Sequence, residues 1–155
     1  MRQTCLFLIF GLFIAFAYPN NIPRIDKLRS RGIKQQVSLE INTFTELPEE
    51  IYGCSSFFYL SKNDRKLKKY IYVNDFGQFA FIKIGKTLEK FTLVKNYSIA
   101  GTRTLLYKKD SILLKIQIKT KESTSDGGDF VTGTMAIQNG NGRTVVLDFI
   151  GDIGC

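Results

Sequence analysis

The chain has 155 residues, of which 44% are apolar and 13% aromatic, and its 22 basic and 14 acidic side chains give a net charge of +8. This length and composition fit one folded domain and exclude a disordered or fibrous chain. The chain contains no histidine, which excludes Ser-His-Asp and Cys-His catalysis, histidine-ligated zinc and the usual proton switch near neutral pH.

Residues 1–17 have the pattern of an export signal. Arg2 precedes an apolar run over residues 6–16, and Ala15-Phe16-Ala17 provides the small-x-small sequence of a cleavage site. The run is shorter than the ~20 apolar residues of a membrane-spanning helix. We therefore predict cleavage after Ala17 and a mature protein located in the periplasm, at the cell surface or outside the cell.

Residues 18–35 are rich in basic side chains and poor in large apolar ones. Pro19, Pro23 and Gly32 discourage a long helix, so we predict a flexible basic N-terminal segment. Asp26 is the one acidic residue of the segment, and the excess of positive charge favours contact with an anionic surface. The basic residues are Arg24, Lys27, Arg29, Arg31 and Lys34.

The sequence from residue 36 to residue 155 predicts a single all-β domain. Apolar and polar residues alternate over 37–42, 112–119 and 144–149, as in half-buried strands. Turns such as Asn139-Gly140-Asn141-Gly142 are too short for crossover helices. We therefore expect an antiparallel meander of about eight or nine strands, closed into a barrel or folded into a sandwich. Six further segments are rich in β-branched and aromatic residues, namely 55–60, 69–73, 79–84, 87–94, 102–108 and 130–138.

Two cysteines, Cys54 and Cys155, follow the predicted export signal. Thiols in a small exported domain usually pair, because the compartment is oxidising. A bond between them would close a loop of about 100 residues, for which the chain-entropy model gives roughly 4.7 kcal/mol of stabilisation. We therefore predict a structural disulfide.

Several patterns are similar to enzyme or metal sites, and each lacks a required part. Residues 85–87, Gly-Lys-Thr, match the end of a phosphate-binding loop, but Ala80 stands where that motif needs glycine. Asp126 and Asp129 supply two carboxylates, which fall short of the ligand set that calcium takes. We therefore expect no catalytic residue, no cofactor and no metal.

A second basic cluster lies between two aromatic segments, with Asp64 as its one acidic residue. One interpretation is a patch that faces an anionic partner. The other is a solvated loop whose charges keep the domain from associating. Export argues against nucleic acid as the partner. The cluster consists of Lys62, Arg65, Lys66, Lys68 and Lys69.

Residues 85–86 (Gly-Lys) and 100–103 (Ala-Gly-Thr-Arg) lie in a run that resembles the small exported lysozyme inhibitors of bacterial envelopes. Those inhibitors are disulfide-bearing antiparallel β-barrels with a Gly-Lys hairpin and a Ser-Gly-Ala-Arg-Tyr-like loop. The resemblance implies that Ser98 and Arg103 contact the target, although Thr104 stands where the tyrosine would follow.

The segments 53–59, 68–84 and 151–155 resemble secreted bacterial proteins more closely, and that resemblance implies no activity. The sequence thus favours a non-enzymatic exported protein that binds at an anionic envelope surface or binds an envelope component. Another protein and a peripheral contact with the membrane are further candidate partners. The alternatives are a lysozyme inhibitor and a carrier, because a barrel of about eight strands can hold one small apolar ligand. Asn96 also fits an N-glycosylation sequon, which applies only in a eukaryotic source.

Overall fold

A computed structural model describes residues 39–123, 125 and 127–155. The described residues belong to one compact unit, Gln36–Cys155. The predicted export signal, the basic segment 18–35 with its five cations and the start of the strand predicted at Val37 lie outside the described residues.

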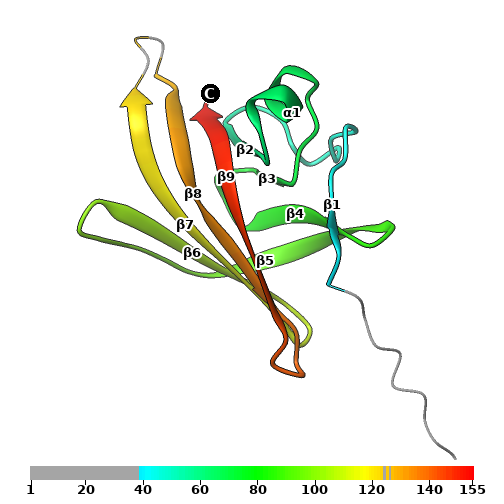
Figure 1. The fold of residues 1–155 in the computed structure, drawn as a ribbon. Helices are drawn as coiled ribbons and strands as arrows, with labels where there is room; N and C mark the ends of the chain where they lie inside the picture. The colour runs from blue at the N-terminus through cyan, green and yellow to red at the C-terminus, as the bar shows by residue number, and fades with distance from the viewer. Residues whose placement is uncertain (1–38, 124, 126) are drawn as a thin grey trace, which may run out of the picture. The chain divides into compact units, whose positions relative to one another are not determined.

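Eight antiparallel strands form a closed β-barrel (Figure 1). Each strand pairs with the next along the chain, and the last strand pairs with the first, so the predicted meander closes as a barrel and not as a sandwich. The strands are β2 (Ser55–Tyr59), β3 (Tyr72–Asn74), β4 (Phe79–Ile84), β5 (Thr87–Ile99), β6 (Thr102–Lys109), β7 (Ile112–Ser123), β8 (Asp129–Gln138) and β9 (Thr144–Gly154).

A ninth strand, β1 (Ile41–Asn42), lies outside the barrel ring and pairs with the end of β4. Among the described residues it is shorter than the strand predicted over 37–42. Leu39 is nevertheless buried in the core, and the Glu40 carbonyl accepts a hydrogen bond from the Gly85 amide at 2.7 Å. The apolar residues of this segment therefore alternate because one side of the chain is buried. Only Ile41 and Asn42 form strand pairs with β4.

A short helix, α1 (Lys62–Lys66), occupies part of the second basic cluster, for which a solvated loop was one of the two interpretations. Ser61 caps it, because its hydroxyl accepts a hydrogen bond from the Asp64 amide at 3.1 Å. β3 then begins later than predicted, since Tyr70 pairs with Phe44 in an isolated bridge before the ladder starts.

Two hairpins extend beyond the closed part of the barrel (Figure 1). β5 pairs in register with β4 only as far as Thr92, and its remaining residues pair with β6 alone. β7 pairs with β6 as far as Ile118, and beyond that residue it pairs with β8 alone. Among the described residues, each of these strand ends therefore has one unpaired edge. The β5–β6 turn at Ala100 and Gly101 has φ angles of 48° and 73°, as a type I′ turn requires.

The barrel interior is filled by aromatic and aliphatic side chains. Phe149 stacks on Phe58 with ring centroids 4.0 Å apart, and Phe58 stacks on Tyr72 at 4.7 Å. The Tyr72 hydroxyl donates to that of Tyr107, and Asn74 donates to the same Tyr107 oxygen, both at 3.0 Å. All five residues are nearly inaccessible to solvent. The stack joins β9, β2, β3 and β6 through the middle of the barrel.

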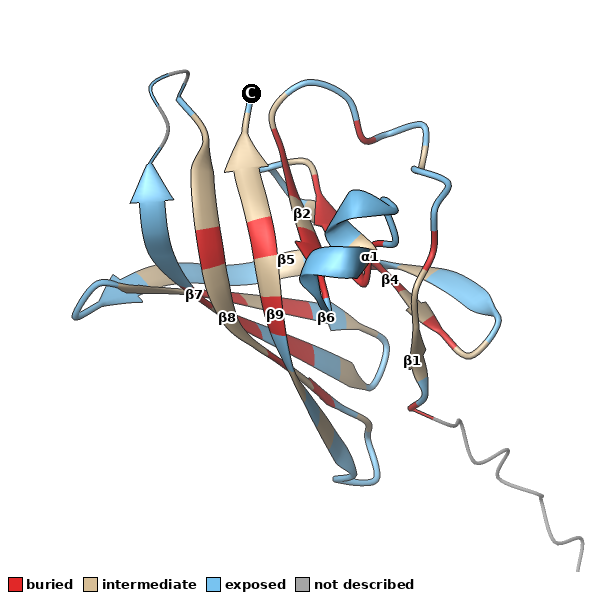
Figure 2. Cartoon of the chain, turned by 45° about the horizontal axis from the view of Figure 1, so that its top comes forward, coloured by how far each residue is buried: buried red, intermediate tan, exposed pale blue. Residues whose placement is uncertain are grey.

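A second apolar cluster packs on the outer face of β2, β3 and β4. Figure 2 shows buried residues along β2 and on β4. The chain between β1 and β2 contributes two of its residues, so this segment packs against the barrel wall before it reaches Cys54. The buried members of the cluster are Phe44, Ile51, Tyr59, Tyr70, Val73 and Phe81.

The disulfide predicted between Cys54 and Cys155 is confirmed. It lies directly beyond the paired residues Ser55 and Gly154, at the end of the seam where β2 meets β9. The two cysteines are 101 positions apart in the sequence. The bond therefore closes the ring of strands covalently.

The disulfide should supply a large share of the stability. We expect Cys54→Ser with Cys155→Ser to lower the free energy of unfolding by up to about 4.7 kcal/mol, because the unfolded chain regains the entropy of a loop of about 100 residues. Urea unfolding measures the loss, and the reduced wild type is the control. Free-thiol titration of the native protein should detect no thiol from these cysteines, and two reactive thiols would contradict the pairing.

Gly151 gives the aromatic stack its space, because it lies opposite Phe58 in the β2–β9 pairing. A Cβ atom at this position would lie 2.2 Å from Cδ1 of Phe58 and 2.8 Å from the carbonyl oxygen of Phe57. We expect Gly151→Ala to lower the free energy of unfolding by about 1–3 kcal/mol in urea titrations. Gly154→Ala is the matched control on the same strand, because its Cβ would lie 3.3 Å from the nearest atom. Equal losses for the two variants would contradict the prediction.

Candidate functional site

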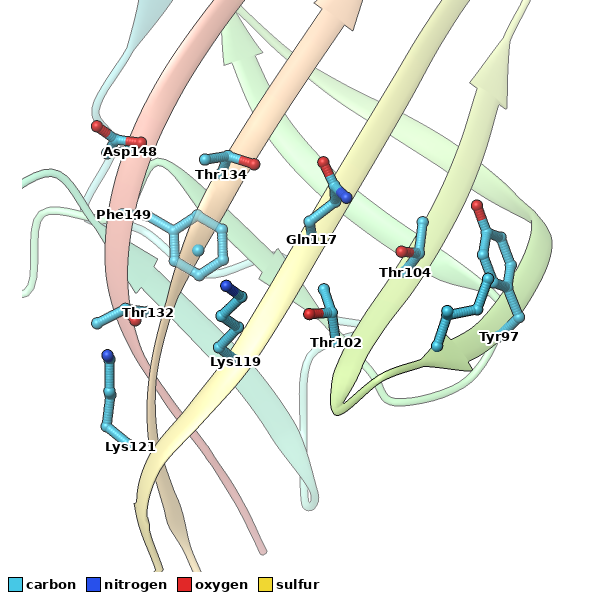
Figure 3. Close-up of a pocket in the computed structure, with 12 residues that line it drawn as sticks. Tyr97, Thr102, Thr104, Gln117, Lys119, Lys121, Thr132, Thr134, Asp148 and Phe149 are labelled. Atoms are coloured by element: carbon cyan, nitrogen blue, oxygen red, sulfur yellow. The ribbon is translucent and has the colours of Figure 1, made fainter.

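A hollow of about 890 Å³ lies over β5 to β9, and we call it the sheet hollow (Figure 3). Five consecutive strands supply its lining, and most of the lining side chains are polar. They are Tyr97, Ile99, Thr102, Thr104, Gln117, Lys119, Lys121, Thr132, Gly133, Thr134, Asp148 and Phe149.

Strand alternation explains why polar side chains gather on this face. Ile116 and Ile118 of β7 are buried in the barrel core, so Gln117 and Lys119 point away from it. The same alternation on β6 and β8 turns hydroxyl side chains to the outside. The sheet hollow is therefore a feature of the outer barrel wall.

The register of the sheet aligns five of these residues in one line across the strands. Tyr97 pairs with Thr104, Thr104 with Gln117, Gln117 with Thr134, and Thr134 with Asp148. We call this line the polar row, and Figure 3 shows it crossing the sheet from β5 to β9. Its members carry hydroxyl, amide and carboxylate groups. Thr104 is buried, and the other four are at least partly exposed.

Lysines bring positive charge to the sheet hollow. Lys119 pairs with Thr132 beside the polar row, and Lys121 lies where the β7–β8 register shifts. Lys95 is not part of the lining, but its ammonium lies 5.1 Å from the centre of the ring of Tyr97, which is. Three ion pairs form within the described part of the chain, and none of these lysines takes part in them.

The second basic cluster lies on α1 and directly after it, and Arg65 has a role of its own. Its guanidinium donates to both carboxylate oxygens of Asp152 on β9 at 2.8 and 2.7 Å, and it lies 5.2 Å from the centre of the Phe130 ring on β8. The hydrogen bond to Asp152 raises the pKa of Arg65. Arg65 thus attaches α1 to the sheet. All five members of the cluster are exposed, and the four lysines are Lys62, Lys66, Lys68 and Lys69.

A second hollow, of about 630 Å³, separates α1 from the ends of β7 and β8. Glu122 and Phe130 pair with each other across these strands, directly beyond Lys121 of the sheet hollow. The structure therefore brings lysines of α1 to the same face of the sheet as lysines of β7. The lining residues are Lys62, Arg65, Lys66, Glu122 and Phe130.

Ser98 and Arg103, the residues identified by resemblance, lie directly opposite each other near the tip of the β5–β6 hairpin. The Arg103 guanidinium donates to the Asn96 side-chain oxygen at 3.3 Å. By strand alternation, these three residues face the other side of the hairpin from Tyr97. They therefore belong to a different surface from the sheet hollow.

The remaining sequence patterns have structural roles. Gly85, with φ of 58°, forms the tight β4–β5 turn with Lys86, so the Gly-Lys-Thr sequence is part of a hairpin. Asp129 accepts a hydrogen bond from the Ser123 hydroxyl at 2.6 Å. Among the residues that the structure describes, no group of three or more acidic or cysteine side chains could hold a metal ion. The same residues include no helix with the length and apolar character needed to cross a membrane.

Comparison of the chain with protein-family models, with curated proteins and with solved structures gives no match. The class of protein therefore rests on the fold and the site. The protein is an up-and-down β-barrel of eight strands with a disulfide where the first and last strands meet, and its outer wall carries a polar and basic hollow.

The sheet hollow was not predicted, although part of its pattern is visible in the sequence. Residues 102–104 (Thr-Arg-Thr) and 132–134 (Thr-Gly-Thr) each place two hydroxyls on one face of a strand, and 117–119 (Gln-Ile-Lys) does the same with an amide and a lysine. Spacing of two shows which residues share a face. Spacing alone does not show the register that places these residues side by side on β6, β7 and β8.

Tyr59, next to the Arg65–Asp152 pair, should make stability depend on alkaline pH. Burial, and then the charge of Asp152, raises the pKa of Tyr59 from 10 to about 12. Folding therefore favours the neutral phenol, and this contribution is complete below pH 10 and is lost as the pH rises through the folded pKa. We expect Tyr59→Phe to reduce the loss of stability between about pH 9 and about pH 11.5 in urea titrations. Identical pH dependence in wild type and variant would contradict this.

Proposed function

We propose that the protein is exported after cleavage near Ala17 and acts without catalysis, by binding an anionic component of the cell envelope through the sheet hollow. The observation that carries the proposal is the polar row with Lys119 and Lys121 beside it, on the outer wall of the barrel. These lysines are exposed, and their charges are available to an anionic partner.

The positions of the other cations support the same partner. Lys62 and Lys66 of α1 border the second hollow, which continues the face that carries Lys121. The five cations of segment 18–35 add positive charge to the same chain. A partner that spans both hollows would therefore meet several lysines. The disulfide is compatible with export, because such bonds persist in oxidising compartments.

The packed interior supports binding on the outer wall over a carrier role. Phe58, Tyr72, Tyr107 and Phe149 occupy the middle of the barrel, and each is at most 3% exposed. A barrel of about eight strands has an interior that side chains alone can fill. Cargo in this barrel would have to displace the aromatic stack.

Inhibition of a lysozyme is the second candidate, and the β5–β6 hairpin favours it. The hairpin extends from the barrel (Figure 1), with Ser98 opposite Arg103 near its tip and Ile99 exposed beside them. Repulsion between two basic proteins weighs against it, because it slows their encounter. A muramidase turbidity assay tests this candidate, and unchanged lysis rates at high protein concentration would exclude it.

The test of the proposed function is sedimentation with isolated cell-envelope fragments at low and high salt. We expect Lys119→Gln with Lys121→Gln to weaken binding by about 2 kcal/mol at low salt, since each lysine near an anionic surface contributes about 1 kcal/mol. The difference should shrink at high salt, because screening shortens the range of the attraction.

The matched control is Lys86→Gln with Lys108→Gln, which removes the same charge from two exposed lysines outside both hollows. This control variant should bind nearly as well as the wild type. Equal weakening by the two double variants would show that net charge, and not the sheet hollow, determines binding.

A further inference from the structure

The polar row narrows the chemistry of the ligand. Hydroxyl and amide side chains both donate and accept hydrogen bonds, and the Asp148 carboxylate accepts them. Four strand intervals of about 4.8 Å make the row roughly 19 Å long. A polar row of this length fits several units of a linear polymer better than it fits one small anion.

Few charged side chains lie along the polar row. Lys119 and Lys121 are the two cations of the lining, and Asp148 is its one carboxylate. A polymer with a phosphate on every unit would meet few cations and would be repelled by Asp148. A polymer with many hydroxyls and occasional carboxylates would find an accessible hydrogen-bonding group of the row on β5, β7, β8 and β9, and a lysine beside the row.

Tyr97 adds a suitable surface at the β5 end of the polar row. Its side chain is partly exposed, and the Lys95 ammonium lies 5.1 Å from the ring centre. An aromatic ring with a hydroxyl combines an apolar face with a polar tip. Sugar rings present the complementary combination of C–H faces and hydroxyl edges.

We propose that the sheet hollow binds an acidic polysaccharide. Sugar hydroxyls bond to Gln117, Thr134 and Asp148, while sugar carboxylates pair with Lys119 and Lys121. This inference rests on the proposed function, and it names the chemical class of the anionic envelope component.

The test is isothermal titration calorimetry of the purified exported protein with three probes. These are hyaluronate oligosaccharides, which carry a carboxylate on every second sugar, neutral dextran and inorganic polyphosphate. We expect hyaluronate to bind most tightly. Gln117→Ala with Thr134→Ala should weaken hyaluronate binding about tenfold, as the loss of two hydrogen bonds predicts, and should leave polyphosphate binding unchanged. Asp148→Asn should strengthen polyphosphate binding and not hyaluronate binding.

Different results would overturn the polysaccharide ligand and the proposed function. Polyphosphate binding that is tighter than hyaluronate binding and that depends on Lys119 and Lys121 would overturn the polysaccharide and leave an anion site. Binding of every probe without dependence on these lysines, or no binding at all, would overturn both. If the double alanine variant melts below the wild type, Thr134→Val provides the same comparison, because it keeps the side-chain size and removes one hydroxyl without changing the charge of the polar row.

Discussion

The pairing of β2 with β9 is the constraint on which the rest of the structure depends. It joins the first and last strands of the barrel through five residue pairs, and without it the meander would be an open sheet with two exposed edges. Two further interactions hold the same seam. The disulfide fixes one end of it, and the stack of Phe58 on Phe149 joins β2 to β9 inside the barrel.

Closure of the barrel determines which surfaces are left for binding. The aromatic stack fills the interior, and the chain from Phe44 to Ile51 covers the outer face of β2 to β4. The outer face of β5 to β9 keeps most of its polar side chains accessible beside α1. Arg65 links this arrangement back to the seam, because its partner Asp152 pairs with Phe57 of β2.

The strands could be predicted because alternation and turn residues are local properties. β4 has the predicted bounds, and β6 to β8 differ from prediction mainly at their ends. β5 continues past the predicted end at Val94, because the bulge between Leu93 and Lys95 shifts the alternation there. α1 has no buried residue, so no periodic apolar pattern indicates it, and it depends on the cap at Ser61 and the contacts of Arg65.

The candidate site was harder to predict for a related reason. The sequence shows that Gln117 and Lys119 share a face, as do Thr102 and Thr104, but the polar row exists only through the register of five strands. Register depends on turns and bulges, and a shift of one residue would turn each side chain to the other face. The basic cluster was visible because its residues are neighbours in sequence. Its place beside the lysines of β7 was not.

The lysines of this face have a second role, because they lie at the unpaired edges of β5 and β7. An open strand edge is a template for another chain, and charged side chains, lysine above all, oppose such pairing. Lys95 lies on the one edge, and Lys119 and Lys121 lie on the other. A bound anion would neutralise the same charges that keep these edges apart. Ligand binding in the sheet hollow would therefore favour self-association through these edges. The risk of aggregation would be highest with a ligand that neutralises the lysines but does not cover the edges.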